Sequence, residues 1–196
     1  MDNEWDAYAD GWDDDPAARA YAAAAFDSLR RLIEASDTAL TRASVLDFGC
    51  GTGLLTERLV EHGAVVVAVD TSGAMLDVVR AKVARHGWST VTTATEPPTS
   101  AAPFDLVVCS SVCAFLDDYP ATVAALTSLL APGGVFVQWD WERAPGDDHG
   151  LTRDEIRRAL EHAPLFDIDV DTAFTVEVGE HTMAPLMGHG RRALSG

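Results

Sequence analysis

A glycine-rich turn and a following aspartate are the residues of this chain best suited to binding a ligand. Gly49, Gly51 and Gly53 form a turn between an expected strand and an expected helix. Glycines let the main chain approach a ligand without an intervening Cβ, and the start of the next helix offers unpaired N–H groups. Asp70 ends the next expected strand, where a carboxylate can accept hydrogen bonds from both hydroxyls of a ribose. Together these residues predict an adenosine-binding site.

The spacing of the glycines argues against two related phosphate sites. A dinucleotide-binding turn has glycine at its first, third and sixth positions, and the sixth position here is Leu54. A P-loop needs a lysine directly after its glycines, and none follows here. The turn therefore favours a nucleoside without a pyrophosphate and disfavours a nicotinamide oxidoreductase.

Alternating strands and helices must position this turn. Apolar runs predict strands at 45–48, 64–69, 91–94, 104–109 and 135–139. Helical spacing and capping residues predict helices at 16–35, 54–62, 120–130 and 152–163, and one more that Ser72 caps and that ends just before Gly87. Alternation over 166–178 and 182–192, with a turn at 179–180, predicts an antiparallel hairpin. The expected fold class is α/β, a three-layer, doubly wound, Rossmann-like sheet that is mostly parallel with an antiparallel C-terminal hairpin strand.

Four segments in this order resemble the motifs of the class I S-adenosylmethionine-dependent methyltransferases, in their small single-domain form. They are 47–53, 67–76, 104–110 and 129–134, and the resemblance covers about residues 40–142. It implies S-adenosylmethionine as the cofactor, S-adenosylhomocysteine as its product and transfer of a methyl group to a small-molecule acceptor. The cofactor-binding residues that it implies are Asp47, Gly49, Cys50, Gly51, Asp70, Thr71, Met75, Thr93, Ala94, Cys109 and Ser110.

The resemblance also implies a role for most of these residues. Gly49 and Gly51 approach the methionine portion and Asp70 holds the ribose. Thr71 and Met75 border the adenine, while Cys109 and Ser110 lie beside the methyl group.

The chain departs from the family pattern at two places. Thr93 stands where relatives usually carry an acid near the adenine, and Ala114-Phe115 stands where many carry histidines after the fourth strand. Direct displacement needs a general base only when the acceptor binds in its protonated form. The catalytic residues are therefore left unassigned, with Tyr8, His149 and Glu142 as candidates. A cofactor-binding regulatory or partner subunit without turnover is the alternative function.

Aromatic residues could shape the acceptor pocket. Trp5, Tyr8 and Trp12 lie in an acidic segment without clear periodicity, which is either disordered or a flap, and they either close as a lid or pack on the first helix. Trp139 and Trp141 either offer aromatic faces near Asp140 and Glu142 to a cationic acceptor, or pack beside solvated acids.

We expect a single domain over 1–196, made of an N-terminal lid segment and helix (1–35), a cofactor-binding core (40–142) and a C-terminal helix and hairpin (143–196). The net charge of −17 disfavours nucleic acid and anionic membranes as partners and is compatible with a salt-tolerant source or with genome base composition. No apolar run reaches the roughly 18 residues of a membrane span, and the N-terminus is acidic, which favours a cytoplasmic protein. Cys50, Cys109 and Cys113 are expected as buried free thiols, and no metal site is expected. The oligomeric state is left open.

Overall fold

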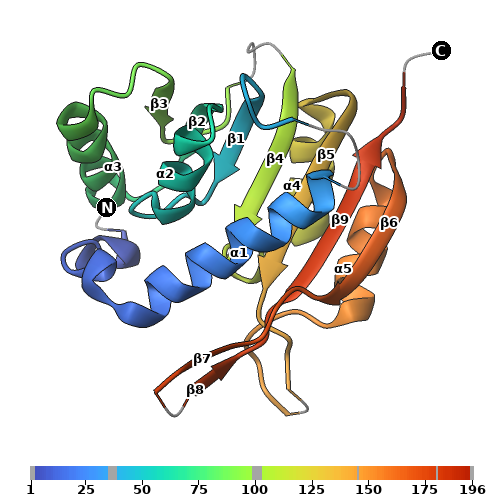
Figure 1. Cartoon of the computed structure of the whole chain (residues 1–196). Coiled ribbons are helices and arrows are strands. Elements are labelled where there is room, and N and C mark those ends of the chain that lie inside the picture. The colour runs from blue at the N-terminus through green and yellow to red at the C-terminus, as the bar shows by residue number, and fades with distance from the viewer. Residues whose placement is uncertain (1–2, 35–38, 99–102, 145, 180, 195–196) are drawn as a thin grey trace. The chain divides into compact units, whose positions relative to one another are not determined.

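The computed structural model describes residues 3–34, 39–98, 103–144, 146–179 and 181–194, and Figure 1 shows their elements. The chain divides into two compact units, Met1–Ala102 and Pro103–Gly196. Each unit combines strands with helices packed along them, and the chain has the predicted mostly parallel, Rossmann-like α/β fold.

The first unit carries three parallel strands in the order β3-β2-β1. They are β1 (Ser44–Phe48), β2 (Val65–Val69) and β3 (Val91–Ala94). Phe48 pairs with Val69, and Val69 pairs with Ala94, so the three strands end side by side. This register places the residues that follow β1 and β2 at the same edge, as the sequence predicted.

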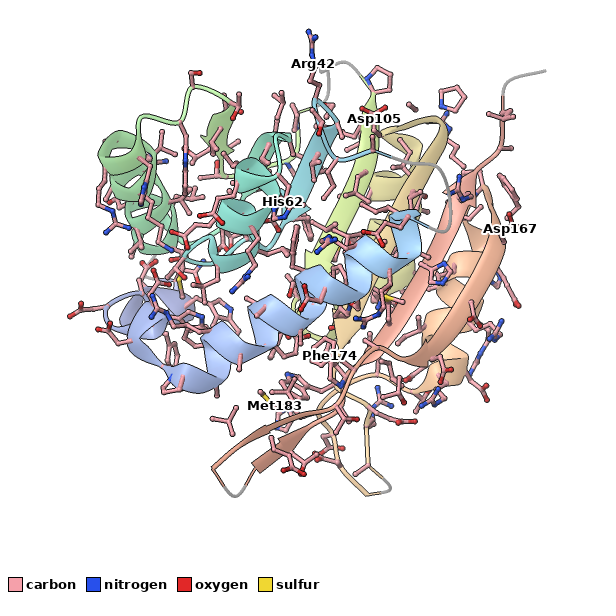
Figure 2. The ribbon with its side chains drawn as sticks, viewed as in Figure 1. Arg42, His62, Asp105, Asp167, Phe174 and Met183 are labelled. Carbon is pink, nitrogen blue, oxygen red and sulfur yellow. The ribbon has the colours of Figure 1, made fainter. Side chains whose placement is uncertain are left out.

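Helices α1 (Pro16–Glu34), α2 (Leu54–Glu61) and α3 (Gly73–His86) complete this unit. The caps read from the sequence are present: Asp15 Oδ1 accepts from the Ala17 N–H at 2.8 Å, and Ser72 Oγ accepts from the Met75 N–H at 3.1 Å. α3 ends at His86 and is capped by Gly87, whose φ of 67° is left-handed. α1 packs on α2, and the ring of His62, labelled in Figure 2, lies 4.6 Å from that of Phe26.

The acidic N-terminal segment is ordered into two short 3₁₀ helices, η1 (Glu4–Tyr8) and η2 (Trp12–Asp14). η1 contacts α3, while η2 contacts α1. The aromatic rings contact one another in series: the ring centres of Trp5 and Tyr8 lie 5.8 Å apart in a tilted arrangement, and those of Tyr8 and Trp12 lie 6.5 Å apart edge to face. The described part of this segment is therefore folded, and its role as a lid stays a prediction.

In the larger sheet of the second unit the strand order is β4-β5-β9-β6. These strands are β4 (Phe104–Ser110), β5 (Leu130–Asp140), β9 (Leu186–Arg192) and β6 (Leu165–Thr172). β4 and β5 are parallel, and β9 runs antiparallel to both β5 and β6. The helical elements are η3 (Cys113–Phe115), α4 (Tyr119–Ser128) and α5 (Arg153–His162). α5 opens with the predicted capping box of Thr152 and Glu155.

Two details of the second unit differ from the sequence prediction. β5 begins at Leu130 rather than at 135, because the Pro132-Gly133-Gly134 turn is taken up as an irregularity in its pairing with β4. The C-terminal hairpin is divided: β7 (Val176–Val178) and β8 (His181–Met183) form a separate two-stranded sheet beyond β6 and β9. Pro185, which has no N–H, lies at this division and accepts from the Ala173 N–H at 2.9 Å.

The core of each unit is apolar, and the three cysteines are buried free thiols as predicted. Val107, Phe136 and Val137 are completely buried, which is typical of strands covered on both faces. Within the described ranges, no helix combines the length and apolar character needed to cross a membrane.

Candidate functional site

The turn after β1 is built from left-handed glycines. Gly49, Gly51 and Gly53 have φ values of 69°, 54° and 86°, which side chains with a Cβ rarely adopt. The N–H groups of Gly49 and Cys50 both donate to the Val69 carbonyl, at 2.8 and 2.9 Å. The turn is therefore tied to the end of β2 and leads directly into α2.

Asp70 stands at the end of β2 with its carboxylate fixed by main-chain donors. Its Oδ2 accepts from the Gly51 N–H at 2.8 Å, and its Oδ1 accepts from the Ser72 N–H at 2.9 Å. A carboxylate oxygen can accept more than one hydrogen bond, so both oxygens keep acceptor capacity. Asp70 is only partly buried. This geometry fits a carboxylate that receives two vicinal hydroxyls.

Gly51 leaves open space beside this carboxylate. A Cβ built on Gly51 would meet no atom within 4 Å beyond those of its two chain neighbours, although the residue lies between two packed elements. Open space in front of bare main chain, next to a fixed carboxylate, is the feature of the first unit that fits a nucleoside.

Replacing Gly51 tests this assignment, and Gly87 provides a matched control. Both glycines have left-handed φ values and nothing within 4 Å of an added Cβ. We expect Gly51→Ala and Gly87→Ala each to lower the free energy of unfolding by about 1–2 kcal/mol. Only Gly51→Ala should weaken S-adenosylhomocysteine binding in calorimetry, by about tenfold, because its methyl group points into the ligand's space. Equal affinities of the two variants would place the ligand elsewhere.

Asp47 and Cys50 lie underneath the turn. Asp47 is completely buried, its Oδ2 accepts from the Thr56 hydroxyl at 2.5 Å, and its Oδ1 has no hydrogen-bond partner within the described part of the chain. Burial, and to a lesser extent the negative charge of Asp70, raise the pKa of Asp47 to about 7 although the Thr56 hydroxyl lowers it. Burial likewise raises the pKa of the Cys50 thiol. Their contact with the cofactor stays a prediction, and their visible role is to support the turn.

The predicted adenine-side residues gather at the ends of β2 and β3. Met75 is buried in the first turn of α3, and the Asp70 N–H donates to the Ala94 carbonyl at 3.2 Å. The Thr93 hydroxyl accepts from Arg80 Nε at 3.1 Å. Thr71 is exposed, and its hydroxyl accepts from Asn3 Nδ2 at 3.0 Å. The N-terminal segment thus reaches a residue expected to border the adenine.

Side chains of the N-terminal segment also bind the turn itself, which the sequence analysis missed. Asp13 accepts from the Thr52 hydroxyl at 2.6 Å and forms an ion pair of 2.6 Å with Lys82 Nζ. Lys82 lies 3.4 Å from Glu57 of α2 and is almost completely buried. The signal was available, because the only lysine of the chain falls on the apolar face of α3 with Met75 and Val79.

An acidic pocket lies beside this contact. Its volume is about 430 Å³, and the 3₁₀ segments line it on one side and α3 on the other. Five aspartates contribute to its lining, and none of the lining residues belongs to the glycine turn. The pocket is therefore distinct from the glycine turn. No group of three metal-ligating side chains occurs among the residues that the structure describes.

In the second unit, Cys109 and Ser110 end β4. Cys109 is completely buried and pairs with Gln138, while Ser110 is partly exposed and pairs with Trp139. β5 continues from here to Asp140, so the carboxyl ends of these two parallel strands lie together.

The three candidate bases are all exposed. Glu142 follows β5 and accepts from Arg153 Nε at 3.1 Å, and His149 lies in the following loop. Tyr8 belongs to the first unit, on η1, and is 55% exposed. Among the described residues, none of the three makes a polar contact that would identify it as the general base, so the catalytic role of each stays a hypothesis.

The end of β5 corrects one expectation. Trp139 is packed, as one of the two readings had it, but Asp140 is not a solvated acid: both residues are completely buried. Of the four residues 139–142, the two that reach the surface are Trp141, which is 39% exposed, and Glu142. The prediction took one face of this strand to be solvated, because apolar and acidic residues alternate along it. In the structure both faces of β5 are covered at Trp139 and Asp140.

Comparisons with known proteins find similarity to methyltransferases. A family model described as "Methyltransferase domain" matches residues 46–136. The ubiquinone biosynthesis O-methyltransferase of Xanthomonas campestris is 36% identical over 118 residues, which are 57% of this chain and 48% of that protein. The chain thus spans about half the length of the curated relatives it matches.

Solved structures share the fold. The N-methyltransferase NodS of Bradyrhizobium japonicum, in complex with S-adenosylhomocysteine, has a TM-score of 0.67 at 21% identity, over 86% of this chain and 85% of that one. A chain of the complex that contains the Haloferax volcanii Trm112 methyltransferase activator has a TM-score of 0.76 at 18% identity, over 98% and 99% of the two chains. At these identities the likeness concerns the fold.

Proposed function

We propose that this chain is a class I S-adenosylmethionine-dependent methyltransferase with methyl-transfer activity. The reaction is a direct displacement that carries the methyl group of S-adenosylmethionine to a small-molecule acceptor. The observation that carries the proposal is the pairing of Asp70 with the open main chain at Gly51.

The residues of the chain bind and orient, and the cofactor, when bound, supplies a methyl group that its sulfonium centre already activates. Asp70 would hold the ribose hydroxyls, and the bare main chain at Gly49 and Gly51 would receive the methionine portion. Alignment of donor and acceptor can lower the barrier by on the order of 7–11 kcal/mol. The absence of an assigned base is compatible with this chemistry.

The names of the curated relatives favour a hydroxyl as the acceptor atom. A hydroxyl binds protonated at neutral pH, so its methylation needs a group that removes the proton. Tyr8, His149 and Glu142 remain the candidates for that role, and amine and carboxylate acceptors are the next classes to consider. The charge of −17 favours neutral or cationic acceptors over highly acidic ones.

Two measurements test the proposal in sequence. Calorimetry with S-adenosylmethionine, S-adenosylhomocysteine and NAD should give binding of the first two at micromolar concentration and none of NAD. Release of labelled methyl groups onto a panel of phenols, amines and carboxylates should then identify an acceptor class. Binding of NAD alone would refute the cofactor assignment. Tight binding of both sulfur nucleosides without turnover over a broad panel would favour a non-catalytic binding subunit.

A further inference from the structure

A chain of buried polar side chains joins the end of β5 to the segment that follows β4. Asp140 Oδ2 accepts from Gln138 Nε2 at 2.9 Å, and Gln138 Oε1 accepts from the Tyr119 hydroxyl at 2.7 Å. Asp140 Oδ1 accepts from the Ala114 N–H at 3.1 Å. Asp140 and Gln138 are completely buried, and Tyr119 is 7% exposed. A buried polar chain of this kind holds its members in one arrangement, because every broken link leaves an unpaired group.

The segment held by this chain is 111–115. It begins at Ser111, which has a left-handed φ of 54° and donates its N–H to the Trp139 carbonyl at 2.7 Å. It ends at Phe115, whose side chain is 55% exposed directly after the anchored Ala114. A left-handed non-glycine residue is strained and persists only where its surroundings hold it. The segment follows Ser110, which the family resemblance places beside the transferred methyl group.

The surroundings of the Asp140 carboxyl group are specific. The titratable groups that interact with it are the thiol of Cys113 and the phenol of Tyr119, and Cys113 in turn contacts Cys109. Burial raises the pKa of Asp140 to about 7, against the opposing effect of hydrogen bonds from Ala114, Cys113 and Gln138. The ionised form accepts all of these bonds, whereas the protonated form must turn one oxygen into a donor. The anchoring of segment 111–115 by Asp140 is therefore strongest above neutral pH.

We propose that Asp140 is a positioning residue for methyl transfer, which anchors segment 111–115 to the end of β5 and so sets how that segment meets the acceptor. Asp140 touches neither cofactor nor acceptor in this assignment. It acts through the Ala114 N–H and through Gln138. The inference rests on the proposed function for its consequence in catalysis, but the anchoring itself is a property of the second unit alone.

Asp140→Asn is the principal variant, because it keeps the shape and removes the charge. We expect kcat/KM for the acceptor to fall about tenfold while the affinity for S-adenosylhomocysteine changes less than about twofold. The wild-type rate should decline as the pH falls through about 7, since protonated Asp140 loses an acceptor. Asp140→Asn should remove the part of this decline that is due to Asp140 and leave any part due to Asp47, whose pKa is also raised to about 7. Tyr119→Phe, which removes the outer hydrogen bond to Gln138, should also lower kcat/KM for the acceptor, by a smaller factor.

Amide hydrogen exchange supplies a readout that needs no activity. In Asp140→Ala the Ala114 N–H loses its acceptor, and we expect it to exchange at least about tenfold faster. Asp154→Asn is the control, since it neutralises an exposed acid of the same unit and should leave exchange, rate and pH profile unchanged. Urea unfolding of each variant establishes that it is folded under the conditions of the assay.

The outcomes separate this inference from the proposed function. If wild-type protein transfers no methyl group, the proposed function fails, and the exchange at Ala114 still decides whether Asp140 anchors the segment. A parallel loss of S-adenosylhomocysteine affinity in Asp140→Asn would overturn the positioning role, because the effect would then extend to the cofactor. Unchanged exchange at Ala114 in Asp140→Ala would also overturn it.

Discussion

Asp70→Ala should weaken S-adenosylhomocysteine binding by roughly 1–3 kcal/mol, or about 5- to 150-fold in Kd. The carboxylate is held by the N–H groups of Gly51 and Ser72 at 2.8 and 2.9 Å, so it is already oriented before the ligand arrives. Its removal leaves two ribose hydroxyls and two main-chain donors without their acceptor. Titration calorimetry of the wild type and the variant measures the difference directly.

Asp77 offers the matched control for Asp70. It lies one helical turn into α3, its side chain is 76% exposed, and its visible partner is Arg80 on the same helix. Asp77→Ala removes the same charge from the same unit and should leave the affinity within about twofold, because an exposed ion pair contributes little. If both variants bind S-adenosylhomocysteine as the wild type does, the ribose is held by another residue and the assignment of Asp70 is wrong.

The core of the first unit could be predicted because its signals are local. Strand β2 is an uninterrupted apolar run, the caps of α1 and α3 are short-range side-chain bonds, and the glycine turn needs three residues that tolerate a left-handed backbone. Each of these features is decided by residues within a few positions of one another. Their order along the chain then fixes the fold class, since parallel strands joined by helices allow few arrangements.

The contacts of the N-terminal segment could not be predicted in the same way. Asn3 reaches Thr71 over 68 positions, and Asp13 reaches Thr52 over 39. Such hydrogen bonds depend on which side chains the packed elements bring close together. Polar residues in a short segment also show no periodic pattern from which their partners could be predicted. The sequence therefore left open whether this segment was disordered, although each of its 3₁₀ helices rests on a long helix.

Asp140 was misjudged for a related reason. Alternation along a strand separates two faces, but it does not say whether either face is solvated. In β5 both faces are covered, so Gln138 and Asp140 must satisfy each other and their neighbours inside the protein. Two polar residues two positions apart in an otherwise apolar strand are the signal that such a buried pair leaves in a sequence.

Loss of both carboxylates around Lys82 should cost the protein about 3–5 kcal/mol of unfolding free energy, the usual penalty for leaving a buried charge unpaired. Lys82 Nζ lies 2.6 Å from Asp13 and 3.4 Å from Glu57, and its side chain is 6% exposed. In the double variant Asp13→Asn and Glu57→Gln, the ammonium stays buried with neutral amides in place of its two counterions. Urea unfolding at neutral pH measures the loss.

Adding Lys82→Met to that double variant distinguishes a buried charge from general disruption of the N-terminal segment. Methionine keeps the apolar stem and removes the ammonium, so most of the lost stability should return, as it does when buried ion pairs are replaced by apolar groups. The exposed pair Arg80–Asp77 on the same helix gives the contrast: its removal should cost less than about 1 kcal/mol. A triple variant no more stable than the double would mean that the ammonium is not the source of the penalty, and that Asp13 acts through the Thr52 hydroxyl instead.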